Sequence, residues 1–71
     1  MKTIYDIQQL LKKFGTIIYV GDRIADLQLM EDELNELYRA QCISSVDFQT
    51  ARLLLRHEIA KLKDTEENKH D

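Results

Sequence analysis

Apolar residues recur every three or four positions in three stretches of this 71-residue chain, and each stretch predicts an amphipathic helix. The predicted helices cover residues 4–13, 23–41 and 45–63. Their apolar stripes consist of Ile4, Ile7, Leu10, Leu11 and Phe14, then Ile24, Leu27, Met30, Leu34, Leu37 and Tyr38, and finally Val46, Ala51, Leu54, Leu55, Ile59 and Leu62. Ala25 and Leu29 widen the apolar face of the second helix, so we expect it to be the central one.

Polar residues and glycines mark the helix ends. Thr3 and Asp6 have the spacing of a capping box at the start of the first helix. Gly15 follows that helix at the position where a left-handed residue ends many helices, and Asp22 is a suitable N-cap for the second. The connection 42–44 is short, which favours antiparallel packing of the second and third helices. The sequence therefore predicts an all-α fold, a three-helix bundle.

A short β-prone segment, residues 16–20, separates the first two helices. Its sequence, Thr-Ile-Ile-Tyr-Val, is rich in β-branched and aromatic residues. A single strand without a partner gains little stability in so small a chain. Two interpretations remain: an extended apolar loop whose Ile17 and Val20 insert into the core, or pairing with the same segment of a second copy. We favour the loop.

Size and charge limit the possible functions. A chain of this length forms one domain with a small core. Residues 64–71 contain no apolar side chain and predict a disordered acidic tail, which leaves a three-helix domain over residues 1–63. The net charge is −3, with basic segments outside an acidic middle. A duplex-DNA-binding domain is usually far more basic, although a local basic face is compatible with this distribution.

Enzymatic and metal chemistry have little support in the residue pattern. His57 is adjacent to Glu58, and neighbouring residues on a helix do not face each other. Asp22 and Asp26 are four residues apart, but no His or Cys joins them at ligand spacing. The residues after Gly21 are not the Lys-Ser/Thr pair of a phosphate-binding Walker loop. We therefore expect a non-enzymatic protein with no catalytic residue, no metal site and no cofactor.

The cellular location is predicted from what the sequence lacks. No charged and then apolar leader opens the chain, and no apolar run approaches the ~18 residues of a membrane span. Cys42 is the only cysteine, which fits a reducing compartment and a small, buried apolar role. We expect a cytoplasmic protein without membrane contact.

Cations and aromatic residues suggest a nucleic-acid partner. Single strands are held by basic side chains that neutralise phosphates and by aromatic rings that stack on bases. The candidate side chains of these types are Lys12, Lys13, Tyr19, Arg23, Arg52 and Arg56. The two lysines also suit the last turn of a helix, where cations complement the dipole. From composition alone, solvated cations are the simpler interpretation, and a binding role depends on whether these residues share a face.

Four sequence motifs resemble the YqgQ-like family, small cytoplasmic proteins of Gram-positive bacteria. The motifs are Leu10-Leu11-Lys12-Lys13-Phe14-Gly15, Ile18-Tyr19-Val20-Gly21-Asp22-Arg23, Asp26-Leu27-Gln28-Leu29-Met30-Glu31 and Leu54-Leu55-Arg56-His57-Glu58. The likeness covers about residues 3–62. It implies a three-helix bundle that binds single-stranded nucleic acid, and it carries this role to Lys12, Lys13, Tyr19 and Arg23. Charge placement alone adds Arg52 and Arg56.

Two functional hypotheses follow. The first is a protein that binds single-stranded DNA or RNA through backbone charge neutralisation and aromatic stacking. The alternative is a non-enzymatic protein–protein interaction module or a small homo-oligomer, in which Ile18, Tyr19 and nearby apolar residues form a contact patch.

Overall fold

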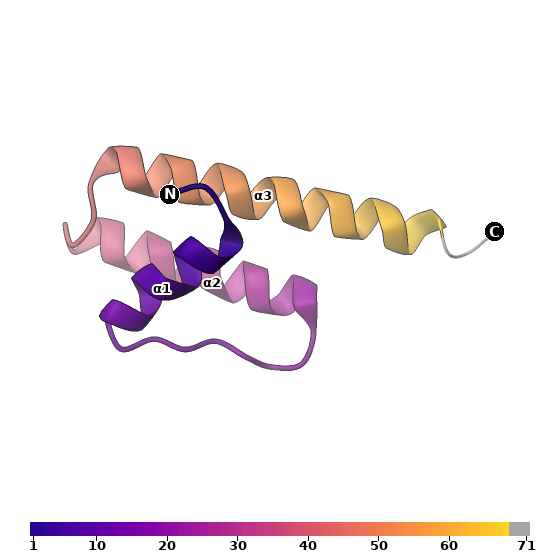
Figure 1. Cartoon of the computed structure of the whole chain (residues 1–71), viewed down its shortest axis with the longest axis horizontal. Coiled ribbons are helices and arrows are strands. Elements are labelled where there is room, and N and C mark those ends of the chain that lie inside the picture. Colours follow the sequence, from indigo (N-terminus) through magenta and orange to yellow (C-terminus); the bar gives the residue numbers. More distant parts are fainter. Residues whose placement is uncertain (69–71) are drawn as a thin grey trace.

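Three helices pack side by side in the computed structural model, which describes residues 1–68 (Figure 1). They are α1 (Ile4–Lys13), α2 (Arg23–Arg39) and α3 (Ser45–Asn68). No residue between 1 and 68 belongs to a β-strand. The all-α, three-helix arrangement predicted from the sequence is confirmed.

The start of α1 is held by the predicted capping box. The Asp6 backbone N–H donates to Thr3 Oγ1 at 3.2 Å, and the Thr3 N–H donates to Asp6 Oδ2 at 3.1 Å. The Lys2 N–H donates to the same carboxylate oxygen at 2.9 Å. These backbone donors, Lys2 first and then Thr3, lower the pKa of the Asp6 carboxyl below its ordinary value, because they stabilise the charged form.

Both α1 and α2 end in a Schellman motif, in which a left-handed residue lets two backbone N–H groups turn back to the last carbonyls. After α1, Gly15 has φ 84°, and the Thr16 N–H donates to the Leu11 carbonyl at 3.0 Å. After α2, the left-handed residue is Gln41 with φ 60°, and the Cys42 N–H donates to the Leu37 carbonyl at 2.8 Å. This turn ends α2 at Arg39, two residues before the predicted end.

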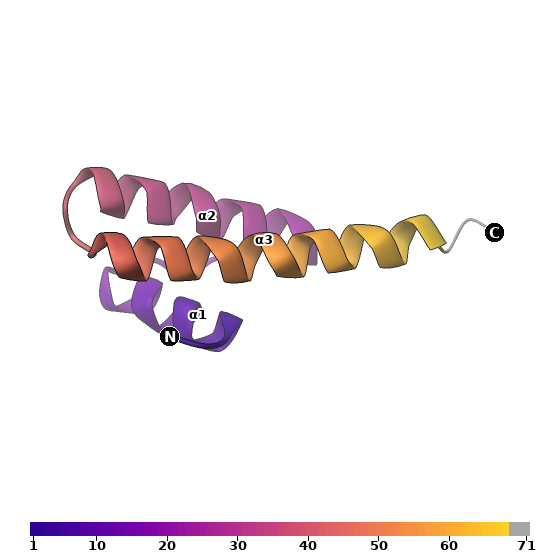
Figure 2. The same ribbon diagram turned by 90° about the horizontal axis from the view of Figure 1, so that it is seen from above.

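α2 and α3 form an antiparallel hairpin, with α1 packed across one side of it (Figures 1 and 2). Eight buried apolar side chains from all three helices form one core: Ile7, Leu11, Leu27, Met30, Leu34, Leu37, Ala51 and Leu55. Every one of them lies on a stripe predicted from the sequence. Val46 does not join them, since it is 70% exposed. Phe48 takes its place, with its ring stacked on that of Tyr38 at a centroid distance of 4.3 Å.

α3 is longer than the sequence predicted. It continues through Asn68, so residues 64–68 are helical where we expected the disordered tail to begin after Lys63. This stretch contains no glycine or proline, and extending an existing helix is far easier than starting one. Thr65 Oγ1 also donates to the Lys61 carbonyl at 3.0 Å. The end of α3 extends past the start of α2 (Figures 1 and 2). Residues 69–71 of the predicted tail lie outside the described residues.

The segment between α1 and α2 is an extended loop, as predicted, but different side chains face the core. Ile18 is half-buried and packs against the core cluster. Ile17 is 80% exposed and Val20 59% exposed, so the expectation that these two insert into the core is wrong. Successive side chains of an extended chain point to opposite sides, so burying Ile18 turns Ile17 outward.

Candidate nucleic-acid interface

An exposed surface runs from the end of α1, along the loop, to the start of α2. We call it the loop surface and define it by Lys12, Phe14, Ile17, Tyr19, Val20 and Arg23, all of which are exposed. Tyr19 is 76% exposed, with Lys12 before the loop and Arg23 after it. Among the side chains of residues 1–65, neither Lys12 nor Arg23 takes part in an ion pair. The loop surface therefore combines apolar and aromatic side chains with available positive charge.

Two carboxylate side chains of α2 accept hydrogen bonds from the loop. Thr16 Oγ1 donates to Glu33 Oε1 at 3.4 Å near one end of the loop. The Val20 backbone N–H donates to Asp26 Oδ1 at 2.7 Å near the other end. Asp22 occupies the N-cap position of α2 as predicted, but its side chain makes no capping hydrogen bond. The loop is thus attached to α2 at two points, and the side chains of the loop surface are exposed.

A pocket of about 210 Å³ lies between α1 and the loop. It is lined by Gln8, Gln9, Leu11, Lys12, Thr16, Ile17, Ile18 and Met30. The sequence analysis did not identify it. A signal was present, because Gln8 precedes Lys12 by four residues and shares its side of α1. The contributions of Ile18 and Met30 could not be foreseen, because they depend on how the loop lies over α2.

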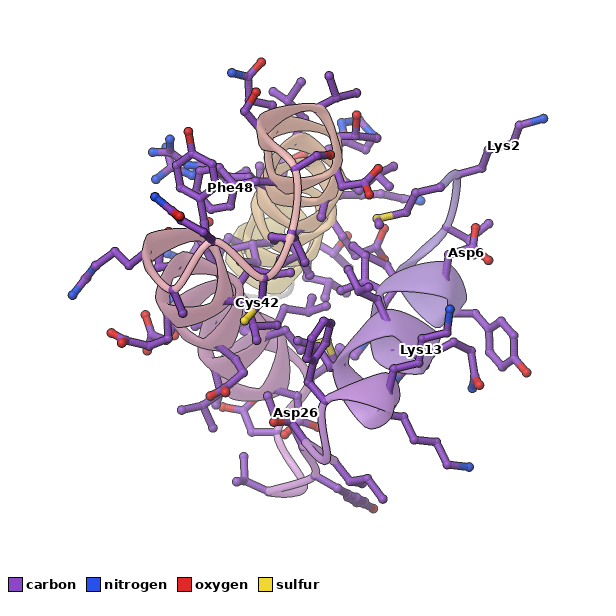
Figure 3. The ribbon with its side chains drawn as sticks, turned by 90° about the vertical axis from the view of Figure 1, so that its left-hand side faces the viewer. Lys2, Asp6, Lys13, Asp26, Cys42 and Phe48 are labelled. Atoms are coloured by element: carbon purple, nitrogen blue, oxygen red, sulfur yellow. The ribbon has the colours of Figure 1, made fainter. Side chains whose placement is uncertain are left out.

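The structure separates the two neighbouring lysines. Lys12 lines the pocket beside the loop, whereas Lys13 lines a shallow depression formed with Met1, Lys2 and Asp6. Figure 3 shows Lys2, Asp6 and Lys13 on the same side of the molecule. Consecutive helical residues diverge by about 100° around the axis, which accounts for the separation. Lys12 belongs to the loop surface, and Lys13 does not.

The two arginines of α3 lie elsewhere. Arg56 Nε donates to Glu31 Oε1 at 3.1 Å across the junction of α2 and α3. Arg52 is four residues earlier and Phe48 eight, so all three share one side of α3. Phe48 lies on the opposite side of the helical pair from Lys13 of α1 (Figure 3). The structure does not bring Arg52 and Arg56 to the loop surface, and Arg56 is already engaged with a carboxylate.

Other chemistry has few candidates among residues 1–68. Among the side chains of residues 1–65, no three His, Cys, Asp or Glu come together in a way that could hold a metal ion. Cys42 is exposed, which corrects the expectation of a buried role. Within the same residues, no helix combines the length and apolar character that crossing a membrane requires.

Comparison with known proteins places the chain in a family. A family model described as YqgQ-like matches residues 1–61. The protein named "Uncharacterized protein YqgQ" from Bacillus subtilis (strain 168) is 46% identical over 63 residues, which cover 89% of each chain. With a match over most of its length on both counts, this chain belongs to the YqgQ-like family.

Proposed function

We propose that this protein binds single-stranded nucleic acid, DNA or RNA, through the loop surface and catalyses no reaction. One observation carries the proposal. Tyr19 is 76% exposed on a loop held at both ends, with Lys12 and Arg23 on either side of it. Cations that follow a phosphate backbone and aromatic rings that stack on bases are the two components of single-strand binding.

The energetics support this use of the loop. A base stacked on an aromatic side chain contributes about 1–3 kcal/mol. The five residues 16–20 extend over about 16 Å at the rise of an extended chain, so the two cations stand far enough apart to contact different phosphates. Because the loop is attached to α2 at Thr16 and Val20, little ordering entropy is lost on binding.

The shape and charge favour a single strand over a duplex. Reading a duplex normally requires a helix or ribbon that enters the major groove with a basic face. The arginines of α3 lie toward its junction with α2, where Arg56 pairs with Glu31. The overall charge is −3, so positive charge acts locally, as at the loop surface.

We further propose a cytoplasmic location, because the exposed thiol of Cys42 suits a reducing compartment.

Fluorescence anisotropy of a labelled single strand, titrated with protein at two salt concentrations, tests the proposal. A duplex of the same sequence is measured in parallel. We expect tighter binding to the single strand and an affinity that falls with salt, because phosphate neutralisation releases counterions. The absence of binding at low salt, where electrostatic attraction is strongest, would refute the proposal.

Matched variants test the site itself. Tyr19→Ala should weaken binding by roughly the 1–3 kcal/mol of one stacked base, whereas Tyr19→Phe keeps the ring and should bind nearly as wild type. Arg23→Ala should also weaken binding. Its control is Arg39→Ala, which removes the same charge from the other end of α2. Arg56→Ala is a second control, away from the loop. If Tyr19→Ala and Arg23→Ala bind like wild type, the site lies elsewhere.

A second candidate is a contact surface for protein, either a partner or another copy of this chain. The observation that favours it is the exposure of two aliphatic side chains, Ile17 at 80% and Val20 at 59%. Aliphatic groups cannot stack as rings do, and burial against protein is their usual stabilising contact. Light scattering over a wide concentration range distinguishes self-association from binding to a different protein. A mass that rises with concentration and falls back in Ile17→Asp would favour self-association, and a constant monomeric mass would exclude it.

A further inference from the structure

The pocket between α1 and the loop offers a specific role within the proposed function. We infer that it accepts one nucleobase of the bound strand, while the base next to it stacks on Tyr19. This inference rests on the proposed function and adds a defined site to it. Its basis is the size, floor and rim of the pocket.

The floor of the pocket is apolar and rigid. Leu11 and Met30 are each 2% exposed and belong to the core, and Ile18 packs against that core. Side chains in a close-packed core keep fixed positions. Ile18 also lies between the two attachments of the loop, at Thr16 and Val20. A flat ring can therefore rest on a preformed surface rather than one that must be ordered at a cost in affinity.

The volume limits the ligand to a small group. Pockets that enclose a drug-sized molecule measure about 300–1,000 Å³. At about 210 Å³, this pocket suits a single planar ring system and not a whole dinucleotide or cofactor. The sugar and phosphate of the same nucleotide would remain outside, at the rim.

The rim supplies the polar contacts that a base and its phosphate require. Gln8 and Gln9 carry amides that can donate and accept, as the edge of a base does. Within the side chains described for residues 1–65, neither amide makes a hydrogen bond, so both are available to a ligand. Lys12 stands at the same rim and can contact the phosphate.

The charge of the lining agrees with this ligand. Of the described residues, none with an acidic side chain lines the pocket, and Lys12 is the one charged residue in the lining. A cationic ligand would have no acidic side chain to pair with in this pocket. A neutral ring with an anionic phosphate suits it, because the ring contacts the apolar floor and the phosphate contacts Lys12. Ile18 lines the pocket, whereas Tyr19, the next residue along the loop, does not line it and is exposed. A strand crossing Lys12 would thus meet the pocket and the exposed ring in succession.

NMR of the methyl groups in the intact protein tests the site directly. The probes are the four common nucleoside monophosphates, with ribose 5-phosphate and inorganic phosphate as controls that lack a base. We expect the Met30 and Ile18 methyl signals to move with the nucleoside monophosphates and not with either control. The Ile59 methyl, on α3, should stay unchanged. Equal shifts with ribose 5-phosphate, or no shift at Met30 and Ile18, would overturn the inference.

Two tryptophan variants sharpen the test. Gln8→Trp places an indole against the pocket and should weaken monophosphate binding by about tenfold or more, or ~1.4 kcal/mol. Gln28→Trp adds the same ring at an exposed position of α2 and should have no effect. Gln8→Ala provides a smaller change at the same position if the indole disturbs folding, and it should weaken binding in the same direction. Wild-type affinity in both Gln8 variants would contradict a base in this pocket.

The oligonucleotide titration separates this inference from the function beneath it. If single strands bind but the pocket signals remain still, the nucleobase site is wrong and the proposed function stands. If neither oligonucleotides nor monophosphates bind, both are wrong.

Discussion

The two halves of this molecule satisfy their side chains in different ways. In the α2–α3 hairpin, apolar stripes face each other, Tyr38 stacks on Phe48, and Arg56 pairs with Glu31. In the half formed by α1 and the loop, the side chains of Ile17 and Tyr19 are exposed to solvent, although the loop is hydrogen-bonded to α2 at both ends. The hairpin, which forms the frame of the fold, also exposes apolar side chains, with Val46 and Leu53 each at 70%. Its Arg56 is paired, however, whereas Lys12 and Arg23 beside the loop form no ion pair among the side chains of residues 1–65.

The difference shows where function is best sought in a small helical protein. A core of eight side chains accounts for the fold without any contribution from the outer side of the loop. The exposed apolar side chains of the loop surface, beside Lys12 and Arg23, are the basis for the proposed role in recognition. Mutations that act on one half and spare the other can test this division.

The largest expected effect is in the hairpin. Leu34→Ala removes a side chain that is 0% exposed and should destabilise the fold by about 2–5 kcal/mol, most of what a domain of this size has. Ile17→Ala removes an exposed side chain and should change stability by less than about 0.5 kcal/mol. Urea denaturation followed by circular dichroism measures both. Similar losses would show that the loop contributes to the frame after all.

A smaller effect is expected at the start of α1. Thr3→Ala removes the hydroxyl that accepts from the Asp6 N–H and should reduce stability by about 1 kcal/mol.

The stabilisation that the Asp6 carboxylate contributes to the capping box depends on pH. The pKa of this carboxyl is lowered in the folded protein, so its stabilisation is complete above the ordinary value of 3.8 and is lost as the pH falls through the lowered one. Asp6→Asn should flatten this acid dependence. Hydrogen exchange of the α1 amides, measured against pH, reports both changes.

The left-handed residues after α1 and α2 allow two matched substitutions whose expected effects on stability have opposite signs. Gly15→Ala places a side chain at φ 84° with open space around it, so only backbone strain acts, and it should destabilise by about 1–2 kcal/mol. Gln41→Gly relieves the same strain at φ 60° and should stabilise by a smaller amount, because Gly loses more conformational entropy on folding. Thermal unfolding of both variants checks this. Shifts of the same sign would contradict the shared left-handed geometry.

The finest comparison is between Lys12 and Lys13. Both alanine variants remove one charge from the last turn of α1, so their effects on the helix should match. Lys12→Ala should weaken single-strand binding a few-fold and make the slope of log affinity against log salt shallower by about one. Lys13→Ala should leave both nearly unchanged. Equal effects on binding would show that the strand follows both sides of α1.

Sequence reasoning identified the frame because its determinants are local or periodic. The capping box at Thr3, the left-handed Gly15 and the stripe through Leu27 and Leu34 depend only on neighbours within one or two turns. The family motifs indicated Lys12, Tyr19 and Arg23, and all three are exposed in the structure. The sequence does not predict the full length of α3, because a stretch without apolar residues is typical of a tail, although a helix can propagate through such a stretch.

By itself, the sequence determined which segments become helices and which face of each is buried. Tertiary structure alone decided which loop side chain turns inward, since burying Ile18 rather than its neighbours follows from how the loop attaches to Glu33 and Asp26. It also decided the site. Helix geometry alone points Lys12 and Lys13 in different directions, but the position of α1 against the hairpin decides that Lys12 borders the pocket over Met30. Contacts between distant segments depend on packing that no local pattern records.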